Sequence, residues 1–187
     1  VLRLNLRGAG PTAKTCRKHY HGGHISDIGD ALDYLDDNIK SNGVFLIGFS
    51  LGGNILLNFL AEHDQYDLLG AASVSASIDP KAAAEKLLSA RNAIYQSRLL
   101  RHMKAEYLSK RNDLSDHEKE VMLNIKSIYD FDDKITGPKN GYKDAEDYYY
   151  QTKSARKIAS IKIPLLMMSA RNDPWIPYAS YEDIKRN

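Results

Sequence analysis

Three short apolar runs divide the chain. They lie at residues 44–49 (VFLIGF), 69–77 (LGAASVSAS) and 163–170 (IPLLMMSA), and short continuous runs of this kind predict buried strands. Residues 1–7 alternate between apolar and polar positions, which predicts one more strand. Apolar residues at three- and four-residue spacing predict a helix from Ser26 or Asp27 to about Asn42, a second after Ser50 and a third from Tyr178. Strands that alternate with helices predict an α/β fold with a mostly parallel sheet and helices on both faces.

The middle of the chain interrupts this alternation. Residues 81–90, 92–110 and 116–129 are charged and amphipathic, and a loop rich in Asp, Gly and Tyr follows them. We therefore expect a core formed by residues 1–79 and 161–187, and a helical cap or lid formed by residues 80–160. We assign no catalytic role to Asp132 or Asp133, because paired Asp residues in a polar loop commonly form turns and caps.

A serine stands at the junction of the run at 44–49 and the helix that follows. The sequence Gly48-Phe49-Ser50-Leu51-Gly52 between a strand and a helix indicates a nucleophile elbow, the sharp turn that exposes the reactive serine of α/β-hydrolases. Gly48 and Gly52 are expected because the strand and the helix approach too closely for a Cβ atom. The backbone N–H of Leu51 is the predicted oxyanion donor.

A serine nucleophile needs a base that takes its proton and a carboxylate that orients the base. Asp173 follows the run at 163–170 and is the candidate acid, although an Asp-Pro turn that merely ends a strand is an alternative. Asp79, which follows the run at 69–77, is the rival acid. All six histidines precede Asp173, whereas the base follows the acid in this fold. We therefore expect the catalytic histidine to lie outside the chain.

The remaining composition adds little chemistry. The sequence His19-x-His21-x-x-His24 has no Cys or acidic partner at ligand spacing, so we predict no metal site and no cofactor. The 26 basic and 24 acidic residues of the 187 are scattered and give a net charge of +2, which does not favour nucleic acid as a partner. A single cysteine, Cys16, fits a reducing compartment, and we expect a cytoplasmic protein without a membrane span in this segment.

The ordered motifs resemble the YheT-like branch of the α/β-hydrolases, which includes the mammalian ABHD-type lipases and yeast medium-chain ester synthases. The matching pieces are Asn5-Leu6-Arg7-Gly8, Tyr20-His21-Gly22-Gly23, Gly48–Asn54, Ser75–Asp79, Phe131-Asp132-Asp133, Tyr148-Tyr149 and Ala170–Pro174. The resemblance implies an internal fragment: a Gly-Gly-His segment beyond Asn187 carries the base, and a His-Gly loop before Val1 supplies the second oxyanion donor.

The resemblance also implies an esterase that acts on short- to medium-chain or lipid-like acyl esters, with Ser50 as nucleophile and Asp173 as acid. Transfer of the acyl group to an alcohol is a close alternative. A non-catalytic binding protein of the same fold, or an inactive truncated product, is an alternative of another class. Because the strand that would lie beside residues 44–49 is missing, we expect residues 1–187 alone to be unstable and inactive.

Overall fold

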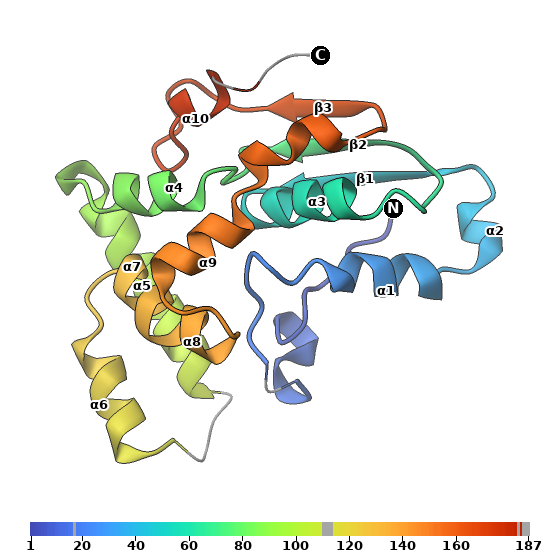
Figure 1. Cartoon of the computed structure of the whole chain (residues 1–187). Coiled ribbons are helices and arrows are strands. Elements are labelled where there is room, and N and C mark those ends of the chain that lie inside the picture. Colours follow the sequence, from blue (N-terminus) through green and yellow to red (C-terminus); the bar gives the residue numbers. More distant parts are fainter. Residues whose placement is uncertain (17, 110–113, 183, 185–187) are drawn as a thin grey trace.

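The computed structural model describes residues 1–16, 18–109, 114–182 and 184. Its centre is a three-stranded parallel sheet in the order β1-β2-β3 (Figure 1). The strands are β1 (Val44–Phe49), β2 (Leu68–Val74) and β3 (Leu165–Met168). They match the three apolar runs, and all three carboxyl ends therefore lie at one edge of the sheet.

The helices fall into two groups. Those next to the sheet are α1 (Ser26–Tyr34), α2 (Asp37–Lys40), α3 (Leu51–Glu62) and α10 (Ala179–Glu182). Those of residues 80–160, here called the helical insertion, are α4 (Pro80–Leu87), α5 (Ala93–Ser109), α6 (Asp116–Asn124), α7 (Ile128–Phe131), α8 (Gly137–Lys139) and α9 (Ala145–Thr152). Short 3-10 turns occur at Gly10–Lys14, Ala90–Asn92, Ser154–Arg156 and Ile158–Ser160, and a π-helix occurs at Asp132–Thr136.

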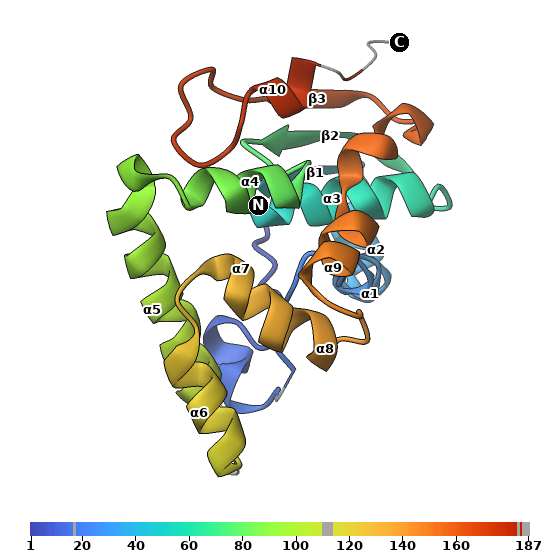
Figure 2. The same ribbon diagram turned by 60° about the vertical axis from the view of Figure 1, so that its left-hand side comes forward.

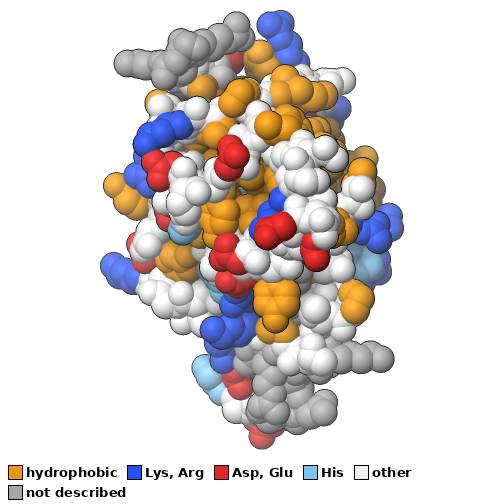
Figure 3. Space-filling view, turned by 90° about the vertical axis from the view of Figure 1, so that its right-hand side faces the viewer, with side chains coloured by type: hydrophobic (Ala, Val, Ile, Leu, Met, Phe, Trp, Pro, Cys, Tyr) orange, Lys and Arg blue, Asp and Glu red, His pale blue; other side chains and the backbone are white. Residues whose placement is uncertain are grey.

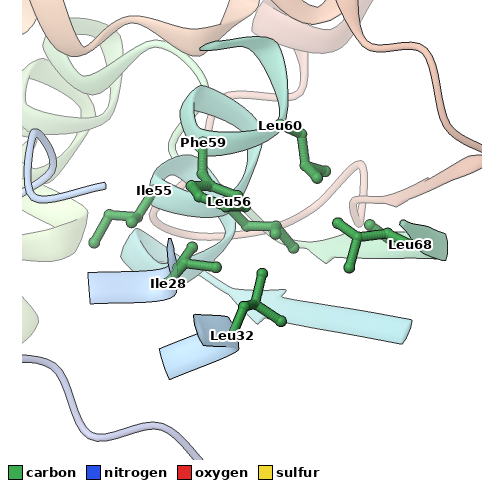
Figure 4. Close-up of a cluster of buried hydrophobic side chains, with 8 residues drawn as sticks. Ile28, Leu32, Ile55, Leu56, Phe59, Leu60 and Leu68 are labelled. Carbon is green, nitrogen blue, oxygen red and sulfur yellow. The ribbon is translucent and has the colours of Figure 1, made fainter. Parts of the chain in front are cut away.

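The main hydrophobic core lies between α1, α3 and one face of the sheet. Figure 4 shows side chains of these elements pointing toward one another. Its buried members are Ile28, Leu32, Ile55, Leu56, Phe59, Leu60, Leu68 and Ala71. Helix α3 is buried on nearly all sides, since even Asn54 and Asn58 on its polar stripe are almost inaccessible. Burial of this kind is the main force that holds the sheet and the helices together.

The opposite face of the sheet is open among the described residues. Phe45, Ile47 and Phe49 of β1 and Leu166 and Met168 of β3 are all at least half exposed there. The expectation of helices on both faces is thus met on one face within the described ranges. Figure 3 shows that hydrophobic side chains on one side of the molecule are intermixed with basic and acidic ones.

The predicted strand at residues 1–7 is wrong. Residues 1–6 are irregular, and Val1, Leu2 and Leu4 are exposed. A strand requires a hydrogen-bonding neighbour, and this segment pairs with no described strand. The segment is anchored at Arg7, whose backbone N–H and Nε donate to the Asp27 carboxylate at 3.0 and 2.6 Å.

The first predicted helix is broken in two. Leu35 is extended (ψ 130°), and Asp36 then starts α2 by accepting a hydrogen bond from the Asn38 N–H. Ile39 is consequently exposed and does not belong to the apolar face. Neither Ser26 nor Asp27 caps α1, because the cap position is Ile25 and the Asp27 carboxylate binds Arg7.

The loop predicted after residue 130 is largely helical. Ser127 and Asp144 each cap a helix by accepting a backbone N–H, so α7 and α9 form where Asp and Tyr suggested a loop. The insertion also has a small core of its own, formed by Leu100, Tyr107, Met122, Ile125, Phe131 and Ile135. Figure 2 shows these helices gathered beside the N-terminal loop. In the part of the chain that is described, every helix is too short or too polar to cross a bilayer.

Candidate functional site

Ser50 occupies the turn between β1 and α3. Its backbone is in a strained region (φ 50°, ψ −119°) that non-glycine residues rarely adopt, and the residue is exposed. The Ser50 N–H donates to the Val74 carbonyl at 2.9 Å, which ties the turn to the end of β2. The hydroxyl makes no hydrogen bond to any described residue. Leu51 is the first residue of α3, so its N–H has no acceptor within the helix and can bind an anionic oxygen.

Two glycines allow α3 to pack against the strands, and one of them is not the residue expected. A Cβ atom on Gly48 would lie 2.6 Å from the Gly52 carbonyl oxygen, so glycine is required there as predicted. A Cβ atom on Gly52 would meet nothing within 4 Å, and the expectation for this position is wrong. The crowded helical glycine is Gly53, where a Cβ would lie 2.8 Å from Ala76 Cβ. The reason is helical rotation: position 53 faces the sheet and position 52 faces away from it.

Asp173 lies at the same edge of the sheet as Ser50. It follows β3, and adjacent strands are about 4.8 Å apart, so the ends of β1 and β3 are about 10 Å apart. Asp173 Oδ1 accepts hydrogen bonds from the N–H groups of Trp175 and Ile176 at 2.9 and 3.0 Å. Oδ2 accepts none from the described residues. The carboxylate is therefore fixed through one oxygen and can receive another donor at the other.

The rival acid Asp79 is used structurally. Its side chain accepts the Ala82 N–H as the cap of α4 and forms an ion pair with Lys153. Both contacts join the end of β2 to the helical insertion. The geometry therefore favours Asp173 over Asp79 as the carboxylate that is open to a base.

The histidines lie away from both groups. His21 and His24 stack with ring centroids 3.8 Å apart under the insertion, whereas His102 and His117 are exposed on it. Burial is the main cause that lowers the pKa of His21 to about 3, so its imidazole is neutral. No described histidine hydrogen-bonds to Ser50 or Asp173.

A cavity of about 620 Å³ separates the N-terminal loop from the insertion. His19, His21 and His24 line it together with Thr136, Asn140 and Tyr142. Across the described ranges, no three His, Cys, Asp or Glu side chains converge as metal ligands would.

Polar contacts that the sequence does not reveal join the insertion to the elbow. Tyr148 Oη accepts the Gly22 N–H at 2.9 Å, and Asn54 and Asn58 both donate to the Thr152 carbonyl, at 3.0 and 2.9 Å. The only sequence signal for these contacts is the Asn that trails the elbow glycines, since a Tyr run in a helix usually indicates packing alone. These bonds place the end of α9 beside the first turns of α3.

Tyr149 serves a different purpose from its neighbour. Its hydroxyl donates to Asp132 Oδ2 at 2.7 Å inside the insertion. Burial is the dominant cause that raises the pKa of Asp132 to about 6, despite the hydrogen bonds it accepts. Neither residue contacts the elbow, in agreement with a structural role for Asp132.

Comparison with known proteins identifies the family. The family model described as "alpha/beta hydrolase fold" matches residues 1–187. The chain is 31% identical over 180 residues to a monoacylglycerol lipase of Saccharomyces cerevisiae, covering 91% of this chain and 40% of that protein. It is 29% identical to the putative esterase YheT of Escherichia coli, covering 94% of this chain and 53% of that protein.

A third relative is the medium-chain fatty acid ethyl ester synthase/esterase 2 of S. cerevisiae, which is 25% identical over the whole of this chain and 47% of its own length. The chain thus spans about half the length of the relatives it matches. No solved structure matches it. With its parallel sheet, its strained serine turn and a family match over every residue, this chain belongs to the α/β-hydrolase fold family.

Proposed function

We propose that the protein carrying this chain is a serine-dependent carboxylic ester hydrolase. The observation that carries the proposal is the geometry of Ser50, whose exposed, unbonded hydroxyl stands at positive φ beside the N-terminus of α3. A serine in that position is presented to a substrate, and the adjacent Leu51 N–H is aimed where negative charge develops on an acyl oxygen. Relatives named as lipase, esterase and ester synthase support an ester as the substrate.

The proposed reaction proceeds through an acyl-enzyme. Ser50 Oγ attacks the ester carbonyl while a general base takes the hydroxyl proton, and the Leu51 N–H stabilises the tetrahedral oxyanion. The base then protonates the departing alcohol. Asp173 Oδ2 orients that base, which is a residue outside this chain because none of its described histidines reaches Asp173. Water finally attacks the acyl-serine and releases the carboxylic acid.

Covalent labelling tests the nucleophile. In the full-length protein that carries this chain, a fluorophosphonate probe should label Ser50, and Ser50→Ala should abolish both labelling and ester turnover. Ser75→Ala is the matched control, since Ser75 also has positive φ (45°) at the end of the neighbouring strand. We expect it to keep the labelling. A well-folded protein that takes up no probe would refute the enzyme and favour a non-catalytic binding protein.

Acyl transfer to an alcohol is the second candidate, favoured by the relative named as ester synthase and esterase. Both reactions share the acyl-enzyme and differ only in whether water or an alcohol resolves it. Turnover of an acyl ester in the presence of ethanol distinguishes them. Formation of ethyl ester in excess of free acid supports the transferase, and free acid alone supports the hydrolase.

A further inference from the structure

Two side chains at the start of the helical insertion reach the backbone of the loop that carries Asp173. Lys86, in the last turn of α4, donates from Nζ to the carbonyl oxygens of Asp173 and Ile176 at 2.7 and 3.2 Å. Asn92 donates from Nδ2 to the Pro174 carbonyl at 2.7 Å and to the Lys86 carbonyl at 3.0 Å. Three carbonyl groups within four consecutive residues are therefore held by one neighbouring segment.

The same four residues fix the carboxylate from inside the loop. Asp173 Oδ1 is held by the N–H groups of Trp175 and Ile176, so the orientation of the carboxylate follows the backbone of residues 173–176. Apolar contacts reinforce the arrangement, since Ile176 is 5% exposed and the Trp175 ring meets the edge of Tyr95 with centroids 5.7 Å apart. Asn92 is itself only 2% exposed, which limits its alternatives to these partners.

Lys86 and Asn92 do not touch the carboxylate. Their donors end on backbone oxygens, and Asp173 Oδ2 stays open toward the edge of the sheet where Ser50 lies. Loss of either side chain leaves carbonyl groups of the loop without a partner, and the backbone can then turn to satisfy them elsewhere. Any such turn moves Oδ2.

We propose that Lys86 and Asn92 are positioning residues, which set the place of the Asp173 carboxylate by clamping the backbone of its loop to the helical insertion. The inference rests on the proposed function, in which Asp173 orients the general base. It assigns to the insertion a part in assembling the acid, in addition to covering the site.

Kinetics of the full-length protein test the clamp. Lys86→Met and Asn92→Ala should each lower kcat for p-nitrophenyl butyrate and the rate of fluorophosphonate labelling about 10- to 100-fold, the range expected for misplacement of a catalytic group by about 1 Å. KM should change less than about twofold, since the substrate contacts are unaltered. The acid limb of kcat/KM against pH should move to lower pH, because a displaced carboxylate no longer stabilises the protonated base.

Two further variants separate positioning from stability. Lys86→Arg should restore most of kcat, because a guanidinium offers several N–H donors over a similar reach. Lys81→Met is the matched control on the same helix; Lys81 pairs with Glu146 on the surface and should leave kcat at the parent value. Melting temperatures recorded for every variant report the folded fraction.

Three outcomes would overturn the proposal. The first is a kcat within twofold of the parent in both Lys86→Met and Asn92→Ala. The second is a loss that only matches the fall in folded protein and that Lys86→Arg does not restore. In both cases Ser50 labelling in the parent shows that the proposed function stands and only the clamp fails. The third is a folded parent that takes up no probe, which refutes the function and the clamp together.

Discussion

At the scale of single residues, the first turn of α3 depends on one glycine and not on its neighbour. Gly53 faces Ala76 and Ser73, and a Cβ there would lie 2.8 and 3.0 Å from their side chains. Gly53→Ala should therefore lower the free energy of unfolding by about 1–3 kcal/mol through overpacking. Gly52→Ala, with open space around the new methyl group, should be neutral or stabilise the helix by up to about 1 kcal/mol. Urea unfolding of the full-length protein measures both, and equal losses would contradict this packing.

Asp132 makes a pH-dependent contribution of unusual sign. Burial raises its pKa in the folded protein to about 6, whereas its ordinary value is 3.8, so the folded state binds the proton more tightly. Asp132 therefore adds stability as the pH falls through 6 toward 4, and it opposes folding at pH 7. Asp132→Asn, which can still accept the Tyr149 hydroxyl, should remove this dependence and raise stability at pH 7 by on the order of 2 kcal/mol.

The measurement compares parent and Asp132→Asn between pH 7 and pH 4. His21 acts in the opposite direction, because burial lowers its pKa to about 3 and stability is lost as the unfolded chain takes up protons below pH 6.5. That contribution is present in both proteins and cancels in the difference. A difference that does not change with pH would show that Asp132 is not desolvated.

At the scale of secondary-structure elements, the N-terminal loop and α9 meet through one hydrogen bond. Tyr148→Phe removes the hydroxyl that accepts the Gly22 N–H and leaves this buried donor unpaired. The expected cost is about 1–3 kcal/mol of unfolding free energy. Tyr150→Phe is the matched control, because Tyr150 is 66% exposed and its ring, which lies under Arg156, is retained. Similar losses in the two variants would argue against a buried bond at Gly22.

The elements also show what could be foreseen from sequence. Short apolar runs predicted all three described strands, and the motif around Ser50 predicted the turn, because these signals are local. The strand at residues 1–7 was not foreseeable as irregular, since pairing depends on a neighbour and alternation says nothing of one. The helices after residue 130 were missed because caps at Ser127 and Asp144 outweigh the turn propensity of Asp and Gly.

The candidate site divides in the same way. Ser50 and Asp173 follow strands, so their common edge was predictable from the parallel arrangement alone. Lys86, Asn92 and Tyr148 were not, because each reaches its partner across at least 82 residues of sequence. A lysine on an amphipathic helix has no sequence feature that distinguishes a backbone clamp from an ordinary surface charge.

At the scale of the whole molecule, the open face of the sheet determines how residues 1–187 behave when produced alone. Phe45, Ile47, Phe49, Leu166 and Met168 form an exposed apolar surface, and β1 is an edge strand in the described sheet. We expect a broad unfolding transition and association that increases with concentration. Light scattering and urea titration measure these properties, with the full-length protein as reference. A monomer with a sharp transition and steady ester turnover would contradict the expectation.

The position of β3 in the chain has a consequence for biosynthesis. Ala71 of β2 pairs with Leu165 of β3, and the whole helical insertion is translated between them. At about 5–20 residues per second, the ribosome needs on the order of 5 to 20 seconds to make that segment. During this interval β1, α3 and β2 are already available, while the β2 edge that β3 will cover is unprotected. A nascent chain of this protein therefore has a defined period in which chaperones can act, and it ends when Leu165–Met168 leaves the exit tunnel.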